Sequence, residues 1–447
     1  ILRAGGNAID AAIAASLMAC VAEPVLASPG GGGFAMARQG ETGTVKLYDF
    51  FTQTPLEKGN GQAGIRKIHA NFGNATQAFH IGPGTSATPG FLRGLETLAN
   101  EYGRLNMPAL TTPAVGRART GIKVTPYQHY LSTVVEPILT ASPKAAALFC
   151  PQGVPPSAGE IFANPDLADT LESFGAGEID AIENAMICGH LSQKDFDHYR
   201  VEQRTPLSVR IANATVHLNP APAASGQLIA HAFKAIAGHN TEAVAAALND
   251  ADQNRSALLG LPASYRGTTH ISVIDREGNA CAITVSNGEG NGELVPDMGF
   301  MVNNMLGEED VNPYPPGEWP CKKRMSSMMC PTLVEYDDGR IISLGSGGSN
   351  RIRSAIFHVL VRILIKNFPL EKAVRAPRLH IEKGHLDFEG FFKQPAIDAL
   401  AANYSDHRVW PEANMFFGGV HAVERDAGHI FSGHGDARRD GYSILVR

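Results

Sequence analysis

The sequence lacks a long hydrophobic run and a concentration of positive charge. No apolar stretch reaches the roughly 18 to 20 residues of a membrane span, and the longest candidate, residues 11–26, carries Glu23 and Pro24. Lys and Arg total 38 against 44 Asp and Glu, for a net charge of −6. Such a balance does not give the basic surface that nucleic acids or anionic membranes require. We therefore expect no nucleic-acid partner and no membrane partner.

Cysteine is also scarce and scattered. The six cysteines form no C-x-x-C pair and have no histidine at zinc-ligand spacing. We interpret them as buried small apolar residues rather than as disulfides. The glycine-rich stretch at residues 30–33 is not followed by the G-K-[ST] of a phosphate-binding loop. The sequence therefore indicates no metal site and no cofactor.

With 447 residues, of which 44% are apolar and 18% charged, the chain can bury a large core. Length alone suggests two or three domains, although a single large layered unit is also allowed. A run of small and apolar residues, 8–17, is apolar on every face and predicts a buried helix. Asn7 and Asp10 are expected to cap its N-terminus.

A β-hairpin is predicted near the middle of the chain. From Thr268 the residues alternate at period two as far as Asp275, and strand-forming residues resume from residue 280 to Ser286. If the turn between them is centred on Glu277, then Asp275 faces Asn279 and Thr268 lies opposite Ser286. Two hydroxyl groups would then meet at the open end of the hairpin.

Gly267 precedes Thr268 and has no Cβ, so the carbonyl between them is open to attack. Cleavage of that bond would leave Thr268 with a free α-amine beside its hydroxyl, which is a nucleophile with a built-in base. The alternative is that Thr268 and Thr269 simply begin a strand, where β-branched side chains pack well.

Another hairpin is expected from residues 332–336 and 341–344, and it leads into a glycine loop at 345–350 and a helix at 351–367. A strand, a glycine loop and a helix N-terminus in this order form an anion-binding arrangement. The loop lacks the spacing of a dinucleotide-binding fingerprint.

From end to end, the chain resembles the gamma-glutamyltranspeptidase family of the N-terminal-nucleophile hydrolase superfamily. The motifs that carry the resemblance are Gly-Gly-Asn-Ala at 5–8, the glycine run at 30–33, Gly-Thr-Thr-His at 267–270, Ser-Ser-Met-Met-Cys-Pro-Thr at 326–332, Gly-Ser-Gly-Gly-Ser-Asn at 345–350 and the closing segment 433–442. The resemblance implies an α+β fold, a four-layer αββα sandwich. It also implies cleavage into a large-subunit region, 1–267, and a small-subunit region, 268–447, which stay associated as one intertwined unit.

The resemblance also implies roles for individual residues. Thr268 would be the nucleophile, and Ser286, where the family has threonine, would orient it. The family's adjacent glycine amides, which form the oxyanion hole, correspond to Gly347 and Gly348, whereas a gapless register would select Gly348 and Ser349. Thr269 is a candidate for a supporting role only.

The substrate-binding residues correspond less closely. Glu308 is acidic where the family places an aspartate that binds the substrate α-amine. Ser326 and Ser327 match the paired serines that hydrogen-bond the substrate carboxylate. Phe51 stands where the family has an arginine that grips the α-carboxylate.

Two further departures are Met305 in place of a glutamine and Gly288 in place of a pocket asparagine. The implied activity is that of a glutathione-hydrolase-like threonine amidohydrolase or transferase, which cleaves gamma-glutamyl or related amide bonds of small molecules, with hydrolysis favoured over transfer. Because of the departures, an acylase or a hydrolase of gamma-linked peptides with a more apolar acyl pocket is the alternative, followed by an unprocessed, non-catalytic relative. Residues 1–8 correspond to a point a short way inside the family's mature protein, so the sequence leaves a cytoplasmic or a periplasmic location open.

Overall fold

Two antiparallel sheets form the centre of the molecule in this computed structural model, which describes residues 1–59, 64–71, 76–255, 268–308, 312, 314 and 317–446. Within these residues the first sheet contains, in spatial order, β10 (Thr269–Ile274), β11 (Ala280–Ser286), β1 (Gly32–Arg38), β2 (Val45–Phe50) and β7 (Glu202–Arg204). The second sheet contains β18 (Phe431–His434), β17 (Gly419–Arg425), β13 (Ile341–Gly347), β12 (Thr332–Tyr336), β9 (Ala214–Leu218) and β8 (Leu207–Ile211).

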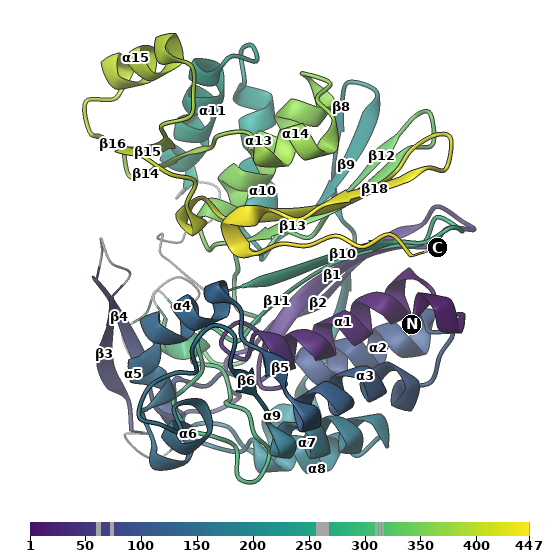
Figure 1. The fold of residues 1–447 in the computed structure, drawn as a ribbon, viewed down its shortest axis with the longest axis vertical. Helices are drawn as coiled ribbons and strands as arrows, with labels where there is room; N and C mark the ends of the chain where they lie inside the picture. The colour runs from purple at the N-terminus through teal and green to yellow at the C-terminus, as the bar shows by residue number, and fades with distance from the viewer. Residues whose placement is uncertain are drawn as a thin grey trace.

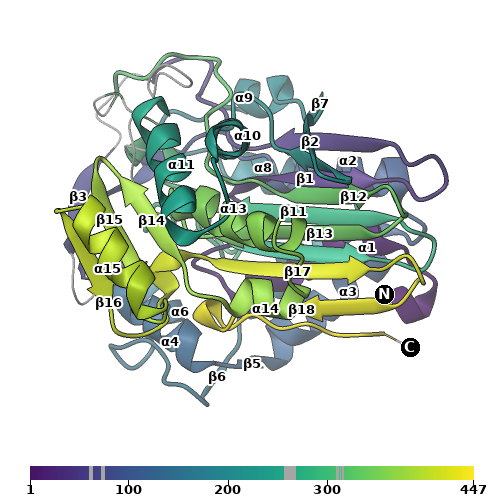
Figure 2. The same ribbon diagram turned by 90° about the horizontal axis from the view of Figure 1, so that it is seen from above.

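Helices cover the outer face of each sheet (Figure 1; Figure 2 shows the same arrangement from above). On the side of the first sheet lie α1 (Ala8–Ala22), α2 (Phe91–Tyr102), α3 (Met107–Thr120), α7 (Pro165–Gly175), α8 (Ile179–Ala185) and α9 (Gln193–His198). On the side of the second sheet lie α10 (Ser225–Ala235), α11 (Thr241–Gln253), α13 (Arg351–Leu364) and α14 (Leu370–Arg375). The predicted four-layer αββα sandwich is therefore confirmed.

Smaller elements surround this sandwich. They are β3 (Arg66–Asn71), β4 (Thr76–Ile81), β5 (Ile122–Lys123), α4 (Pro126–Val134), α5 (Glu136–Leu139), α6 (Pro143–Phe149), β6 (Ile161–Phe162), β14 (Leu379–Glu382), β15 (His385–Glu389), α15 (Gln394–Asn403) and β16 (His407–Trp410). Short 3-10 helices lie at η1 (Leu2–Ala4), η2 (Pro83–Thr85), η3 (Met305–Gly307), η4 (Met415–Phe417) and η5 (Ala437–Arg439).

The alternation of side chains along β1 shows how the first sheet separates two hydrophobic cores. Phe34 and Met36 contribute to the core shared with the second sheet. Ala35 and Ala37, on the opposite face, pack in the core beneath α1 and α2. Successive strand residues point to opposite faces, so a strand buried on both sides carries apolar residues at every position.

Helix α1 is buried on nearly all sides, as predicted from its composition. The Asn7 side chain accepts hydrogen bonds from the backbone of Ile9 and Asp10, and the Asp10 carboxylate accepts one from the Asn7 backbone. This reciprocal capping box satisfies amides that a buried helix start would otherwise leave unpaired. Of the six cysteines, four are buried, as the sequence predicts, whereas Cys188 and Cys321 are half-buried.

The central hairpin forms in the predicted register. Thr269 pairs with Val285 and Ile274 with Ala280, and the backbone amide of Asp275 donates to the carbonyl of Asn279 at 3.0 Å. The turn is local, since the Asp275 carboxylate accepts from the amide of Asn279. The predicted hairpin of β12 and β13 is present as well, although β13 continues to Gly347, beyond the predicted end.

Candidate active site

Thr268 lies immediately before β10, the edge strand of the first sheet, and is only 5% exposed. The register that pairs Thr269 with Val285 makes Thr268 and Ser286 the next pair along the hairpin. The Ser286 hydroxyl accepts a hydrogen bond of 3.1 Å from the amide of Gly288. Two hydroxyl side chains are thus positioned by local strand pairing at the open end of the hairpin, whereas Gly267 lies outside the described residues.

The glycine loop after β13 packs directly against Thr268. A Cβ on Gly347 would lie 2.2 Å from the Thr268 carbonyl oxygen, so no larger residue fits there without displacing the backbone. Gly348 has a φ of +122°, and a Cβ there would lie 2.9 Å from the Cα of Gly418. Helix α13 starts three residues later, at Arg351. The structure therefore brings Thr268, Gly347 and Gly348 together, from segments about 80 residues apart in the sequence.

His270 lies between the two sheets near this site. Its Nδ1 is 2.7 Å from the Thr284 hydroxyl and its Nε2 is 2.8 Å from the Ser272 hydroxyl. Burial holds the pKa of His270 well below its usual value, and the nearby His421 lowers it further. The imidazole is therefore neutral at physiological pH, and both of its nitrogens are occupied within the sandwich.

Phe51 follows β2 and is almost completely buried, at 1% exposed. Its ring stacks on Phe34 with the ring centroids 5.5 Å apart, within the core between the sheets. Its carbonyl accepts hydrogen bonds from the Tyr199 hydroxyl at 2.7 Å and from Arg324. The Arg324 guanidinium also lies over the Tyr199 ring, 4.6 Å from its centroid, and pairs with Asp49 at 3.5 Å. Both Phe51 and Arg324 are therefore held by contacts within the protein.

Glu308 is 6% exposed and lies against the end of the hairpin. Gly288, two residues after Ser286, has a φ of +64°, and a Cβ there would lie 2.1 Å from the Glu308 carboxylate and 2.1 Å from the Asn304 side-chain oxygen. The Glu308 carboxylate therefore fills the space into which a side chain at position 288 would extend. Met305, in η3, is 1% exposed.

Ser326 and Ser327 make their contacts away from the hairpin. The Ser326 hydroxyl donates to the Pro222 carbonyl at 2.8 Å, and the Ser327 hydroxyl accepts from the Met329 amide at 3.1 Å. Their hydrogen bonds thus anchor the segment that leads into β12.

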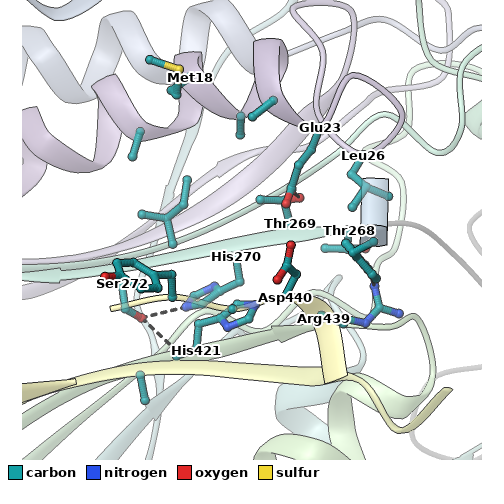
Figure 3. A pocket seen from close by; sticks show the side chains of 18 of the residues that line it. Met18, Glu23, Leu26, Thr268, Thr269, His270, Ser272, His421, Arg439 and Asp440 are labelled. Carbon is teal, nitrogen blue, oxygen red and sulfur yellow. Dashed lines mark hydrogen bonds between the residues drawn. The ribbon is translucent and has the colours of Figure 1, made fainter. Parts of the chain in front are cut away.

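A pocket of about 310 Å³ adjoins Thr268 along the free edge of β10 (Figure 3). Its walls come from α1, from residues 268–272, from β17 and from the closing segment 439–442. Its polar side chains are Glu23, Tyr127, Thr268, Thr269, His270, Ser272, His421, Arg439, Asp440 and Tyr442.

Sequence reasoning missed the charged residues of this pocket. The Thr269 hydroxyl donates to the Glu23 carboxylate at the end of α1. Burial raises the pKa of Glu23, while the Thr269 hydrogen bond and the positive charge of Arg439 oppose that rise. One feature of the sequence could have pointed to this pocket, since Glu23 is the one acidic residue between positions 11 and 40.

The described part of the chain holds no group of three or more His, Cys, Asp or Glu side chains arranged to bind a metal ion. Over the same residues, no helix combines the length and the apolar character needed to cross a membrane.

The layered fold defines the class of the protein, which is the N-terminal-nucleophile hydrolase fold. In solved structures, the cephalosporin acylase of Bacillus halodurans superposes with a TM-score of 0.81 at 21% identity, over 99% of this chain and 92% of that chain. The family model of gamma-glutamyltranspeptidase matches residues 1–258 and 240–446. The chain therefore belongs to the gamma-glutamyltranspeptidase family.

Curated relatives match over nearly the whole chain. The capsule biosynthesis protein CapD proenzyme of Bacillus anthracis is 27% identical over 99% of this chain and 87% of its own length. The glutathione hydrolase proenzyme of Bacillus subtilis strain 168 is 24% identical over 100% of this chain and 89% of its own length. The acylase ACY 1 proenzyme of Pseudomonas sp. strain SE83 is 26% identical over 100% of this chain and 90% of its own length. Family membership together with these relatives supports an amidohydrolase or acyl-transfer activity on small amide substrates.

Proposed function

We propose that this chain is a self-cleaving amidohydrolase in which Thr268 forms an acyl-enzyme with gamma-glutamyl or related amides. The observation that carries the proposal is the contact between Thr268 and the glycine loop, where Gly347 lies directly against the Thr268 carbonyl oxygen. The paired position of Ser286 supports it further. The names of the relatives, which include proenzymes that are glutathione hydrolases and acylases, agree with a processed hydrolase.

In the first step, the Thr268 hydroxyl attacks the carbonyl of Gly267. The peptide C–N bond breaks as an ester forms between Gly267 and the Thr268 oxygen, and the hydroxyl proton passes to the nitrogen, which becomes the α-amine. Water then hydrolyses the ester, so that residues 1–267 form the large chain with a new carboxylate and residues 268–447 form the small chain with a free Thr268 hydroxyl. The new α-amine of Thr268 has a reference pKa near 7.7 to 8.0, so a large share of it is neutral near physiological pH. It can then take the proton from the hydroxyl as that oxygen attacks an amide carbonyl.

The tetrahedral oxyanion that forms is stabilised by the amides of Gly347 and Gly348, each such donor contributing about 2.7 to 4 kcal/mol. Ser286 orients the Thr268 hydroxyl, and the leaving amine takes up the proton. Water then releases the acyl group in preference to transfer to another amine. Glu308 is proposed to bind the substrate α-amine, and Ser326 and Ser327 the polar end of the acyl group.

A second candidate is an acylase that accepts a more apolar acyl group. The observation that favours it is Phe51, whose ring stacks on Phe34. The gamma-glutamyltranspeptidases that the chain resembles have a carboxylate-binding arginine at the position of Phe51. Met325, Met328 and Met329 belong to the same buried cluster as Phe51. The Phe51 ring therefore lies in an apolar environment, whereas Arg324 is held by Asp49 and the Phe51 backbone carbonyl.

Self-cleavage is tested by intact-mass analysis of purified wild type, Thr268→Ala and Thr269→Ala. We expect two chains in the wild type and in Thr269→Ala, because the Thr269 hydroxyl points to Glu23 on the other face of the strand. We expect one full-length chain in Thr268→Ala. A single uncleaved chain in the wild type would instead support an unprocessed, non-catalytic relative. Equal cleavage in Thr268→Ala would support a different nucleophile.

A further inference from the structure

Three side chains on the second sheet form a hydrogen-bonded chain that ends at an exposed serine. Ser208 on β8 lies directly opposite His217 on β9, and its Oγ is 2.9 Å from the His217 Nδ1. On the other side of the ring, the His217 Nε2 is 2.8 Å from the Glu335 carboxylate on β12. Ser208 is exposed, whereas the His217 side chain is 12% exposed and that of Glu335 26%. A hydroxyl, an imidazole and a carboxylate are thus joined in series, with the serine open to solvent.

The carboxylate at the inner end of this chain is ionised and held in place. The Nε of Arg38, from β1 of the first sheet, donates to Glu335 at 2.7 Å, and a terminal nitrogen of Arg38 donates to the Gly278 carbonyl at 2.7 Å. Burial alone would raise the pKa of Glu335, but hydrogen bonds from His217 and Arg38 outweigh it and hold that pKa below its usual value. An ionised carboxylate only accepts hydrogen bonds, so in neutral His217 the ring proton lies on Nε2. The lone pair of Nδ1 then accepts from the Ser208 hydroxyl.

This order of groups is that of an activated serine. In nucleophilic catalysis a serine hydroxyl lies within hydrogen-bond reach of a base, and a third group orients that base. A comparable set occurs at Ser354, whose Oγ is 2.8 Å from the His380 Nδ1, while the His380 Nε2 is 3.3 Å from Glu382. Ser354 is only 2% exposed, however. Exposure therefore distinguishes Ser208, because a reagent from solution can reach it.

The three residues lie away from Thr268. The strands of the second sheet follow the order β18-β17-β13-β12-β9-β8, so β8 lies at the edge far from β17, which lines the pocket beside Thr268 (Figure 1). None of Ser208, His217 and Glu335 lines that pocket. A reaction at Ser208 is therefore independent of the proposed amidohydrolase function.

We propose that Ser208 is a second nucleophile, which accepts an acyl group from an activated ester with His217 as its base. The Ser208 oxygen attacks the ester carbonyl and forms a new C–O bond, while the His217 Nδ1 takes the hydroxyl proton. The bond between the acyl carbon and the leaving alcohol then breaks, and the alcohol takes that proton from His217. Glu335 is a positioning residue that keeps the other ring proton on Nε2. Phosphonyl reagents with a good leaving group react at the same oxygen.

The inference is tested by treating the purified protein with a fluorophosphonate and following the labelled peptides over time by mass spectrometry. We expect the label at Ser208 in the wild type. Mapping separates this label from any label at Thr268, so the outcome does not depend on the proposed function. Ser432, an exposed serine on β18 whose hydroxyl donates to Glu424 at 3.3 Å, should remain unlabelled. Absence of label at Ser208, or equal labelling of Ser208 and Ser432, would overturn the inference.

Variants then test the base and its orientation. His217→Gln should slow the labelling of Ser208 roughly 100-fold or more, because a general base typically contributes about 10²- to 10⁴-fold. Glu335→Gln should slow it as well, because an amide can donate to Nε2 and so leave the ring proton on Nδ1. Glu335→Asp, which keeps the carboxylate, should retain more of the rate than Glu335→Gln.

The matched control for these variants is His239→Gln, at an exposed histidine just before α11, which should leave the labelling rate unchanged. Melting temperature reports whether each variant folds. A folded His217→Gln or Glu335→Gln protein that is labelled at Ser208 at the wild-type rate would overturn the inference, because the serine would then react without help from the imidazole.

Discussion

Phe51 is held in the core between the two sheets by its stacking on Phe34, and its carbonyl is held by Tyr199 and Arg324. A glutamyl α-carboxylate that entered this region would lose its hydration and meet an aromatic ring. A charged hydrogen bond contributes about 1.5 to 3 kcal/mol, so its absence implies roughly 10- to 150-fold weaker recognition of that carboxylate. The identity of this one residue therefore bears on which acyl groups the protein accepts.

We predict that the wild type has a higher kcat/KM for acyl anilides without an α-carboxylate than for the matched gamma-glutamyl anilide. Phe51→Arg should shift this ratio towards the glutamyl donor, while Phe51→Leu, which keeps an apolar side chain, should leave it near the wild-type value. The measurement is the ratio of kcat/KM values in the three proteins. A strong glutamyl preference in the wild type contradicts the prediction even if the buried arginine prevents Phe51→Arg from folding.

Single residues also show the limit of sequence reasoning. Thr268 and Ser286 could be placed opposite each other because a local turn at residues 275–279 sets the register. The proximity of Glu23 and Arg439 could not be predicted, because 416 positions separate them and no periodic pattern links them. The proximity of two such charges depends on three-dimensional packing, and it becomes visible only when all neighbours are known.

At the scale of elements, the strand, loop and helix formed by β13, the glycines and α13 carry the proposed oxyanion site. Gly347 cannot accept a Cβ without moving the Thr268 backbone, and the φ of Gly348 is one that larger residues rarely adopt. The order of these elements was predicted from the sequence, because hydrophobic alternation ends at a glycine cluster. The continuation of β13 to Gly347 was not predicted, because glycine has a low propensity for strands.

Gly348→Val should lower kcat by about 10² to 10³, because it displaces amides that stabilise the oxyanion. Gly347→Ala should act in the same direction through its contact with the Thr268 carbonyl. Gly116→Val in α3 is the control, since a Cβ there meets nothing within 4 Å. Melting temperature and the extent of self-cleavage report whether each variant folds, and normal turnover in a well-folded Gly348→Val would remove this loop from the mechanism.

For the whole molecule, each sheet contains strands from both sides of the proposed cleavage site. In the first sheet β11 pairs with β1, and in the second sheet β12 pairs with β9. The fold class followed from the resemblance and the hairpins from local patterns. The assignment of strands to sheets depends on contacts between distant segments, which turn chemistry and periodicity do not encode.

We predict that the two cleaved chains remain together because separating them would expose both cores. The chains should co-elute as one species in size-exclusion chromatography under native conditions and separate only in denaturant. The measurement is the elution volume in buffer and in concentrated guanidinium chloride, with uncleaved Thr268→Ala as the reference for size. Elution of separate small and large chains in native buffer would contradict an architecture in which both chains contribute strands to each sheet.

The most direct test of the Thr268 nucleophile is the mass of the small chain after brief incubation of the wild type with an activated acyl ester and acid quenching. The account predicts a chain that begins at Thr268, heavier by one acyl group, with the group mapped to Thr268 by peptide fragmentation. It also predicts no adduct in Thr268→Ala under the same conditions. An acyl group on any other residue, or a small chain that begins elsewhere, would contradict the account.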